Sequence, residues 1–139
     1  MNKIKLFGIV AIVTMIGLSS CGKYEDGPGI SFRSKKGRVE GEWKLSSRTT
    51  NGTNETLDAD EKDDTYKFTK DGKVEVQDPG NATITGDWVF DSKKENMTIT
   101  YSAFGFSFAQ KVKILELRNN EMKWEYTDGT DKYVEVYTQ

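Results

Sequence analysis

The chain has 139 residues, of which 30% are charged and 35% are hydrophobic, a length that accommodates one domain with a tail. It contains no histidine, which removes the commonest general base and the commonest metal ligand. Its single cysteine excludes an internal disulfide and a multi-cysteine zinc site. The formal net charge of -2 argues against a nucleic-acid partner, because nothing in that balance offsets repulsion from phosphates.

Residues 1–20 have the layout of a secretory signal peptide. A basic start is followed by an apolar run, Leu6 to Leu18, which is shorter than the roughly 20 residues that a membrane-spanning helix needs. The run ends in Leu18-Ser19-Ser20-Cys21, which resembles the lipobox of bacterial lipoproteins. That resemblance implies cleavage before Cys21, a diacylglycerol on its sulfur and an acyl chain such as palmitate on its amine. The alternative is an ordinary signal peptide followed by a free cysteine.

These features predict a lipid-anchored protein of the bacterial cell envelope, held in the outer membrane and facing the periplasm or the cell surface. Residues 21–38 predict the lipidated cysteine and a flexible tether, because Gly27-Pro28-Gly29 cannot continue a helix or a strand. A tether of this length reaches at most roughly 55 Å. The predicted divisions are the signal peptide at 1–20, the tether at 21–38 and a folded domain at 39–139.

From residue 39 onward, apolar and polar residues alternate with a period of two, which is typical of half-buried β-strands. The pattern repeats about eight times, in segments that begin near Val39, Tyr66, Val74, Ile84, Met97, Phe104, Met122 and Tyr133. Short breaks such as Lys70-Asp71-Gly72 carry turn residues and fit hairpins between antiparallel neighbours. We predict an all-β fold, an antiparallel up-and-down meander of about eight strands that closes into a barrel and hides its edges. A two-sheet β-sandwich is the alternative.

Three segments depart from the regular alternation. Ile114 and Leu115 are both apolar, which predicts a β-bulge. The segment Thr50 to Asp63 is polar and acidic, and we expect a mobile surface loop with a short helix near Leu57 to Lys62. Phe104-Gly105-Phe106-Ser107-Phe108 alternates phenylalanine with small residues and is aggregation-prone unless covered. A covered core strand is therefore predicted, and an exposed docking patch is the alternative.

Two short motifs indicate a family. Gly41-Glu42-Trp43 resembles the Gly-x-Trp signature of lipocalins, and Gly86-Asp87-Trp88 repeats the pattern. A tryptophan can plug the closed end of a barrel, and a glycine lets a neighbouring chain approach closely. Together with the lipobox and the tether, the chain resembles small Bacteroidetes lipocalin-like lipoproteins from about Val39 to Thr138. The resemblance implies a lipocalin-like barrel that binds a small ligand.

The titratable residues favour a protein that is not an enzyme and has no cofactor or bound metal. The serines have no histidine partner, which excludes a catalytic triad. Nothing places two carboxylates on inward-facing strand positions, as glycoside hydrolysis would need. An acidic cluster in the long loop offers oxygen ligands for calcium, but it lacks the spacing of an EF-hand, so a solvated loop is predicted. The cluster consists of Asp58, Asp60, Glu61, Asp63 and Asp64.

Aromatic residues make up 12% of the chain and carry the strongest functional hint. An eight-stranded barrel is just wide enough to be filled by side chains or to hold one small ligand, so a filled core and a ligand-sized cavity both stay open. The candidate ligand-binding residues are Trp43, Trp88, Phe106, Phe108, Trp124 and Tyr126.

Two functions are compatible with these observations. The first is a membrane-anchored, non-catalytic binder of a small apolar or amphipathic ligand. The second is an interaction or structural lipoprotein with a filled barrel, whose loops contact a protein or glycan partner. The lipid anchor makes the membrane a partner in both cases, and neither involves nucleic acid.

Overall fold

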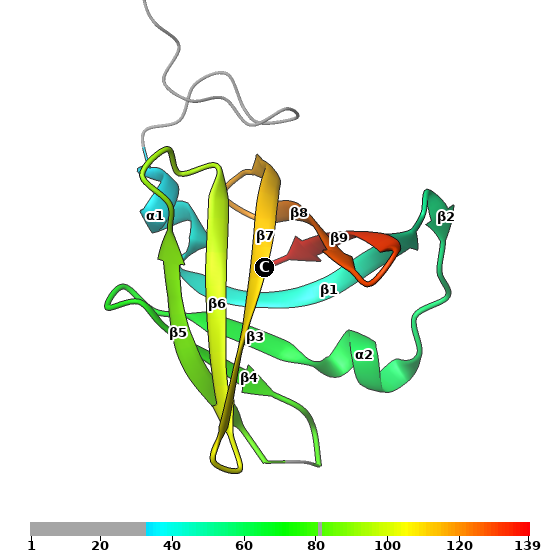
Figure 1. The fold of residues 1–139 in the computed structure, drawn as a ribbon, viewed down its shortest axis with the longest axis horizontal. Coiled ribbons are helices and arrows are strands. Elements are labelled where there is room, and N and C mark those ends of the chain that lie inside the picture. Colours follow the sequence, from blue (N-terminus) through cyan, green and yellow to red (C-terminus); the bar gives the residue numbers. More distant parts are fainter. Residues whose placement is uncertain (1–32, 81) are drawn as a thin grey trace, which may run out of the picture.

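The fold is one antiparallel sheet rolled into a barrel (Figure 1). The computed structural model describes residues 33–80 and 82–139, so the predicted signal peptide, Cys21 and most of the predicted tether lie outside the described residues. In chain order the elements are α1 (Lys35–Val39), β1 (Gly41–Thr50), β2 (Thr53–Asn54), α2 (Ala59–Asp63), β3 (Thr65–Phe68), β4 (Lys73–Gln77), β5 (Ile84–Phe90), β6 (Asn96–Ala103), β7 (Phe106–Leu117), β8 (Glu121–Asp128) and β9 (Asp131–Thr138).

The barrel closes between its first and last strands. Strands β3 to β8 each pair with the next strand in sequence, β1 pairs with β3, and β9 returns to pair with β1. The closing ladder runs from Lys44 opposite Thr138 to Thr50 opposite Tyr133. The two-residue strand β2 only extends β1 as a hairpin. This confirms the predicted all-β up-and-down barrel, and the sandwich alternative is wrong because a sandwich would leave β1 and β9 as unpaired edges.

Helix α1 covers one end of the barrel, at the top of Figure 1. Ser34 caps the helix by accepting a hydrogen bond from the Gly37 amide at 3.0 Å. The buried Arg38 guanidinium donates to the Leu117 carbonyl at 2.7 Å, and the Trp43 indole donates to the Val39 carbonyl at 2.8 Å. These bonds hold residues 35–38, the end of the predicted tether, against the barrel. Among the described residues, no helix combines the length and apolar character needed to cross a membrane.

The two Gly-x-Trp motifs lie at this covered end. Gly41 has a φ of 142°, a conformation that other residues rarely adopt. Gly86 lies so close to the neighbouring strand that a Cβ there would collide with the carbonyl oxygen of Thr100. Gly41 therefore allows an unusual backbone conformation, and Gly86 allows a tight backbone approach. Each lies two residues before a buried tryptophan that contacts α1: Trp43 donates to the Val39 carbonyl, and the Trp88 ring lies 5.7 Å from the Lys36 ammonium.

Apolar side chains pack the covered half of the barrel. Phe68 contacts Trp88 edge-to-face with ring centroids 5.9 Å apart, and Trp88 contacts Phe90 in the same way at 5.8 Å. The Trp88 indole satisfies its donor on the Thr69 carbonyl at 3.1 Å. The other members of this core include Val39, Trp43, Val74, Met97, Ile99, Val112, Ile114, Leu117 and Met122. We call this half, beneath α1, the closed end, and the half around the β6–β7 turn the open end.

Two β-bulges interrupt the alternation. The predicted bulge is confirmed in β7, where the register with β8 shifts between Ile114 and Glu116. A second bulge, which the sequence pattern does not indicate, lies in β1 between Leu45 and Ser47. An extra residue reverses the alternation of the side chains that follow. The β1 bulge therefore places Arg48 on the same face as its β9 partner, the buried Glu135.

The prediction of a covered core strand at the Phe104–Phe108 segment is wrong. Phe104, Phe106 and Phe108 are 93%, 78% and 56% exposed. The β5 ladder ends at Ser102 of β6, and the β8 ladder ends at Lys113 of β7, so the β6–β7 hairpin projects beyond both neighbours. No adjacent strand covers its tip, which explains the exposure.

The acidic segment between β1 and β3 is anchored to the barrel. The short helix predicted there is confirmed as α2, and Asp58 and Glu61 form a capping box at its start. We expected a mobile surface loop here, but two contacts hold the segment on the barrel. Leu57 is buried in the core, and Glu61 accepts a hydrogen bond from Arg48 of β1 at 2.5 Å. The segment therefore packs against the side of the barrel where β1 has separated from β3.

Candidate binding site at the open end of the barrel

A buried carboxylate, Glu135, is the centre of the open end. Its side chain is 5% exposed and lies on the inner face of β9. One carboxylate oxygen accepts from the Trp124 indole and the Tyr137 hydroxyl, both at 2.8 Å. The other accepts from Arg48 Nε at 2.8 Å and from the Tyr126 hydroxyl at 3.2 Å. Four donors therefore satisfy a charge that would be costly to bury alone.

Arg48 links this centre to helix α2. Its Nη1 lies 2.5 Å from Glu61 and 3.7 Å from Glu55, while its Nε contacts Glu135. Burial alone lowers the pKa of Arg48, but the hydrogen bonds that Arg48 donates to Glu135 and Glu61 outweigh it and raise that pKa above its ordinary value. Arg48 thus stays charged, and it couples the barrel wall to the segment that packs over the β1–β3 gap.

Tyrosines surround the polar centre. Burial, reinforced by the negative charge of Glu135, raises the pKa of Tyr66 to about 12. Burial is also the main cause that raises the pKa of Tyr101, Tyr126 and Tyr137 above the ordinary tyrosine value. These phenols therefore stay neutral at physiological pH and act as hydrogen-bond donors or acceptors within an aromatic wall.

The same tyrosines stack on one another and on phenylalanine. Tyr101 packs on Phe108 of the β6–β7 hairpin with ring centroids 5.1 Å apart. Tyr126 stacks on Tyr133 at 5.0 Å, and Tyr66 meets Tyr137 edge-on at 5.4 Å. Rings of this kind offer apolar faces next to polar edges, and a ligand with both characters can contact both.

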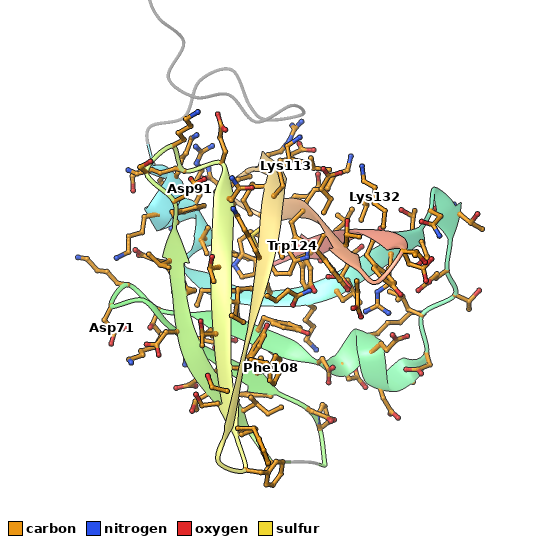
Figure 2. The ribbon with its side chains drawn as sticks, in the orientation of Figure 1. Asp71, Asp91, Phe108, Lys113, Trp124 and Lys132 are labelled. Atoms are coloured by element: carbon orange, nitrogen blue, oxygen red, sulfur yellow. The ribbon has the colours of Figure 1, made fainter. Side chains whose placement is uncertain are left out.

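The structure separates the six sequence-predicted ligand residues. Trp43 and Trp88 are 0% and 4% exposed and belong to the packed core of the closed end. Figure 2 shows Trp124 between the two ends and Phe108 near the β6–β7 turn at the open end. Trp124 and Tyr126 both donate to Glu135, and Phe108 packs on Tyr101. Phe106 lies near the tip of the hairpin. Only Trp124 and Tyr126 are thus joined to one another, through the carboxylate of Glu135.

Sequence reasoning missed Arg48 and Glu135. It expected almost only apolar residues on inward-facing positions, and that expectation is wrong for Glu135, whose carboxylate points inward between aromatic rings. The signal in the sequence is a charged residue flanked by Val134 and Val136 on a strand rich in β-formers. Whether Glu135 or its two valine neighbours face inward is decided by the pairing of β9 with β1.

The acidic segment does not form a metal centre. Within residues 33–80 and 82–139, no group of three or more histidine, cysteine, aspartate or glutamate side chains could hold a metal ion. Asp64, which ends α2, has a buried Oδ1 without a hydrogen-bond partner. Burial and the nearby Asp78 carboxylate raise the pKa of Asp64. Asp64 therefore ends α2 as a partly buried carboxyl group whose charged form is disfavoured.

Comparison with known proteins supports the architecture. The sequence model of a family described as "lipocalin-like domain" matches residues 39–124. A crystal structure of a lipocalin-like protein from Bacteroides uniformis ATCC 8492 superposes with a TM-score of 0.56 at 18% sequence identity, over 74% of this chain and 99% of that chain. At this identity the superposition shows a shared fold. No curated protein matches the sequence.

Proposed function

Because this chain belongs to the lipocalin-like domain family, we propose that it is a non-catalytic binder of a small apolar or amphipathic ligand. The observation that carries the proposal is the contrast inside the barrel. The closed end is packed with apolar side chains, whereas the open end holds the Arg48–Glu135 pair among buried and half-buried phenols, with the exposed Phe108 beside them. The ligand's apolar part would pack on the rings and its polar part would face the hydroxyls.

Tryptophan fluorescence tests this proposal, because Trp124 contacts the centre of the open end. The probes are a fatty acid, haem and a bile-like amphiphile, each titrated into the purified domain. Saturable quenching that weakens at least about fivefold in Phe108→Ser would support the open end as the site. The matched control is Val89→Ser, since Val89 is also an exposed apolar residue but lies on β5 at 62% exposure. Equal loss in both variants, or no response to any probe, would contradict the proposal.

The proposal extends to the location of the protein. We propose a Bacteroidetes envelope lipoprotein anchored in the outer membrane through Cys21, on the basis of the lipobox-like Leu18-Ser19-Ser20-Cys21. Two or more acyl chains on one residue anchor a protein stably, since each buried CH₂ contributes about 0.8 kcal/mol. Metabolic labelling with a palmitate analogue should mark the wild type and not Cys21→Ala. Equal labelling of both would contradict the anchor.

A second candidate function rests on the β6–β7 hairpin. Phe104 and Phe106 are among the most exposed large apolar side chains of the described residues, and exposed aromatic clusters mark contact sites for protein partners. In this alternative the barrel is a filled scaffold, and the hairpin tip inserts into an apolar surface of a protein partner. The alternative predicts that no small amphiphile quenches Trp124, while Phe104→Ser with Phe106→Ser abolishes capture of the partner.

A further inference from the structure

A recessed site lies at the line where β7 and β8 separate, and its lysines face the outside of the barrel. The ladder between these strands ends at Lys113 opposite Glu125. Beyond that pair, within the described chain, β7 continues on β6 and β8 continues on β9. The separation leaves a cavity of about 310 Å³. Its lining consists of Asn96, Lys111, Lys113, Glu125, Tyr126, Thr127 and Lys132.

The charge of this cavity is opposite to that of the whole chain. Three lysines face one glutamate there, whereas the chain carries a formal net charge of -2. Glu125 lies between two of the cations, at 2.7 Å from Lys132 Nζ and 3.8 Å from Lys113 Nζ. Within the lining the three lysines outnumber the single carboxylate, so the lining itself carries a positive charge.

We propose that this cavity binds a phosphate group carried by a small polar molecule or by a lipid headgroup. Lysine ammonium groups are common partners of phosphate, and three of them converge from β7 and β9. The volume exceeds that of a bare phosphate, and the Asn96 amide and the Thr127 hydroxyl can hydrogen-bond a polar body attached to it.

The lysines of this site lie outside the barrel, and the site adjoins the open end only at Tyr126, which lines the cavity and also donates to Glu135. Val112 and Ile114 alternate with Lys111 and Lys113 along β7 and are buried in the core, so the lysines occupy the outer face. Figure 2 shows Lys113 near the upper end of β7 and Phe108 near its lower end. Failure of the amphiphile experiments would therefore leave this proposal standing, and the reverse also holds.

Glu125 makes the proposal specific, because its carboxylate occupies the position between Lys113 and Lys132 that a phosphate would take. The glutamate competes with the ligand for the same cations. Replacing it with glutamine removes the competitor while keeping its size, so Glu125→Gln should bind phosphate about threefold or more tightly than the wild type.

The experiment titrates three probes into the purified protein at low salt: inorganic phosphate, glucose 6-phosphate and vesicles containing phosphatidylglycerol. Amide chemical shifts report the position of binding, and calorimetry or vesicle co-sedimentation reports its strength. The test variant is Lys111→Gln with Lys132→Gln. The control is Lys44→Gln with Lys70→Gln, which removes the same charge from exposed positions on β1 and the β3–β4 turn.

Binding of any one probe should shift amides near Lys111–Lys113 and Glu125–Thr127 and weaken about fivefold or more in the test variant only. Binding of the soluble probes identifies a soluble ligand, and binding of vesicles alone identifies a headgroup. Either result supports the site. Three results would overturn it: no binding of any probe, equal loss in the control variant, or unchanged affinity in Glu125→Gln.

Discussion

The two ends of the narrow barrel are filled with different kinds of side chain. Beneath α1, Phe68 packs edge-to-face on Trp88. The indole N–H groups of Trp43 and Trp88 donate to backbone carbonyls. Around the β6–β7 turn, Arg48 and Glu135 form a charged pair that tyrosines enclose. The closed end gains stability from apolar burial, whereas the open end keeps polar groups among its rings, and the proposed ligand site rests on these groups.

The largest effect should come from the closed end. Phe68 is 2% exposed and packs edge-to-face on Trp88. Phe68→Ala removes the ring and leaves a cavity, so it should lower the free energy of unfolding by about 3–5 kcal/mol. Urea denaturation followed by tryptophan fluorescence measures this. A loss below about 1 kcal/mol would mean that the closed end is not the main source of stability.

Breaking the charged pair should have the next largest effect. Arg48→Met leaves the buried Glu135 carboxylate without its cation, and removing one partner of a buried pair costs about 3 kcal/mol. The double variant Arg48→Met with Glu135→Gln removes the stranded charge and should recover part of that loss. If the single and double variants are equally stable, the pair does not hold the open end together.

The tyrosines predict a loss of stability at alkaline pH. Below about pH 10 the phenols are neutral in both the folded and the unfolded chain. As the pH rises further, the unfolded chain releases a proton that Tyr66 retains up to about pH 12, so unfolding is favoured. Tyr66 alone should account for about 2–3 kcal/mol. Denaturation at increasing pH measures the loss, and Tyr66→Phe should reduce it.

A smaller effect is expected where α2 meets the barrel. Glu61 completes the capping box with Asp58 and accepts from Arg48. Glu61→Gln keeps the size of the side chain but removes its charge, and should lower the free energy of unfolding by about 1 kcal/mol. Hydrogen exchange should speed up in residues 58–64 more than in β3. Uniform acceleration would show that α2 is not a local unit.

The smallest effect should be at the hairpin tip. Phe106 is 78% exposed, so Phe106→Ala should change the free energy of unfolding by less than about 0.5 kcal/mol. The same Phe→Ala change at Phe68 and at Phe106 should therefore have very different effects on the free energy of unfolding, which distinguishes the two ends of the barrel. A large destabilisation would indicate that the phenylalanines are covered in solution.

The strands could be predicted because alternation is a local property. Tyr66 and Phe68, or Met97 and Ile99, show their face within a few residues. Arg48 and Glu135 could not be predicted, because the bulge at Leu45–Ser47 is visible only in the pairing of β1 with β9. The exposure of Phe106 likewise depends on where β5 and β8 stop.

The docking of α1 at the plugged end has a practical consequence for handling the protein. The chain enters the barrel there, since the Arg38 and Trp43 bonds hold the helix against the ends of β7 and β1. A label, bead or carrier attached before residue 33 would therefore leave the open end of the barrel accessible. A fusion within the β6–β7 turn would obstruct the open end, so the protein should be immobilised through its N-terminal side in a binding screen.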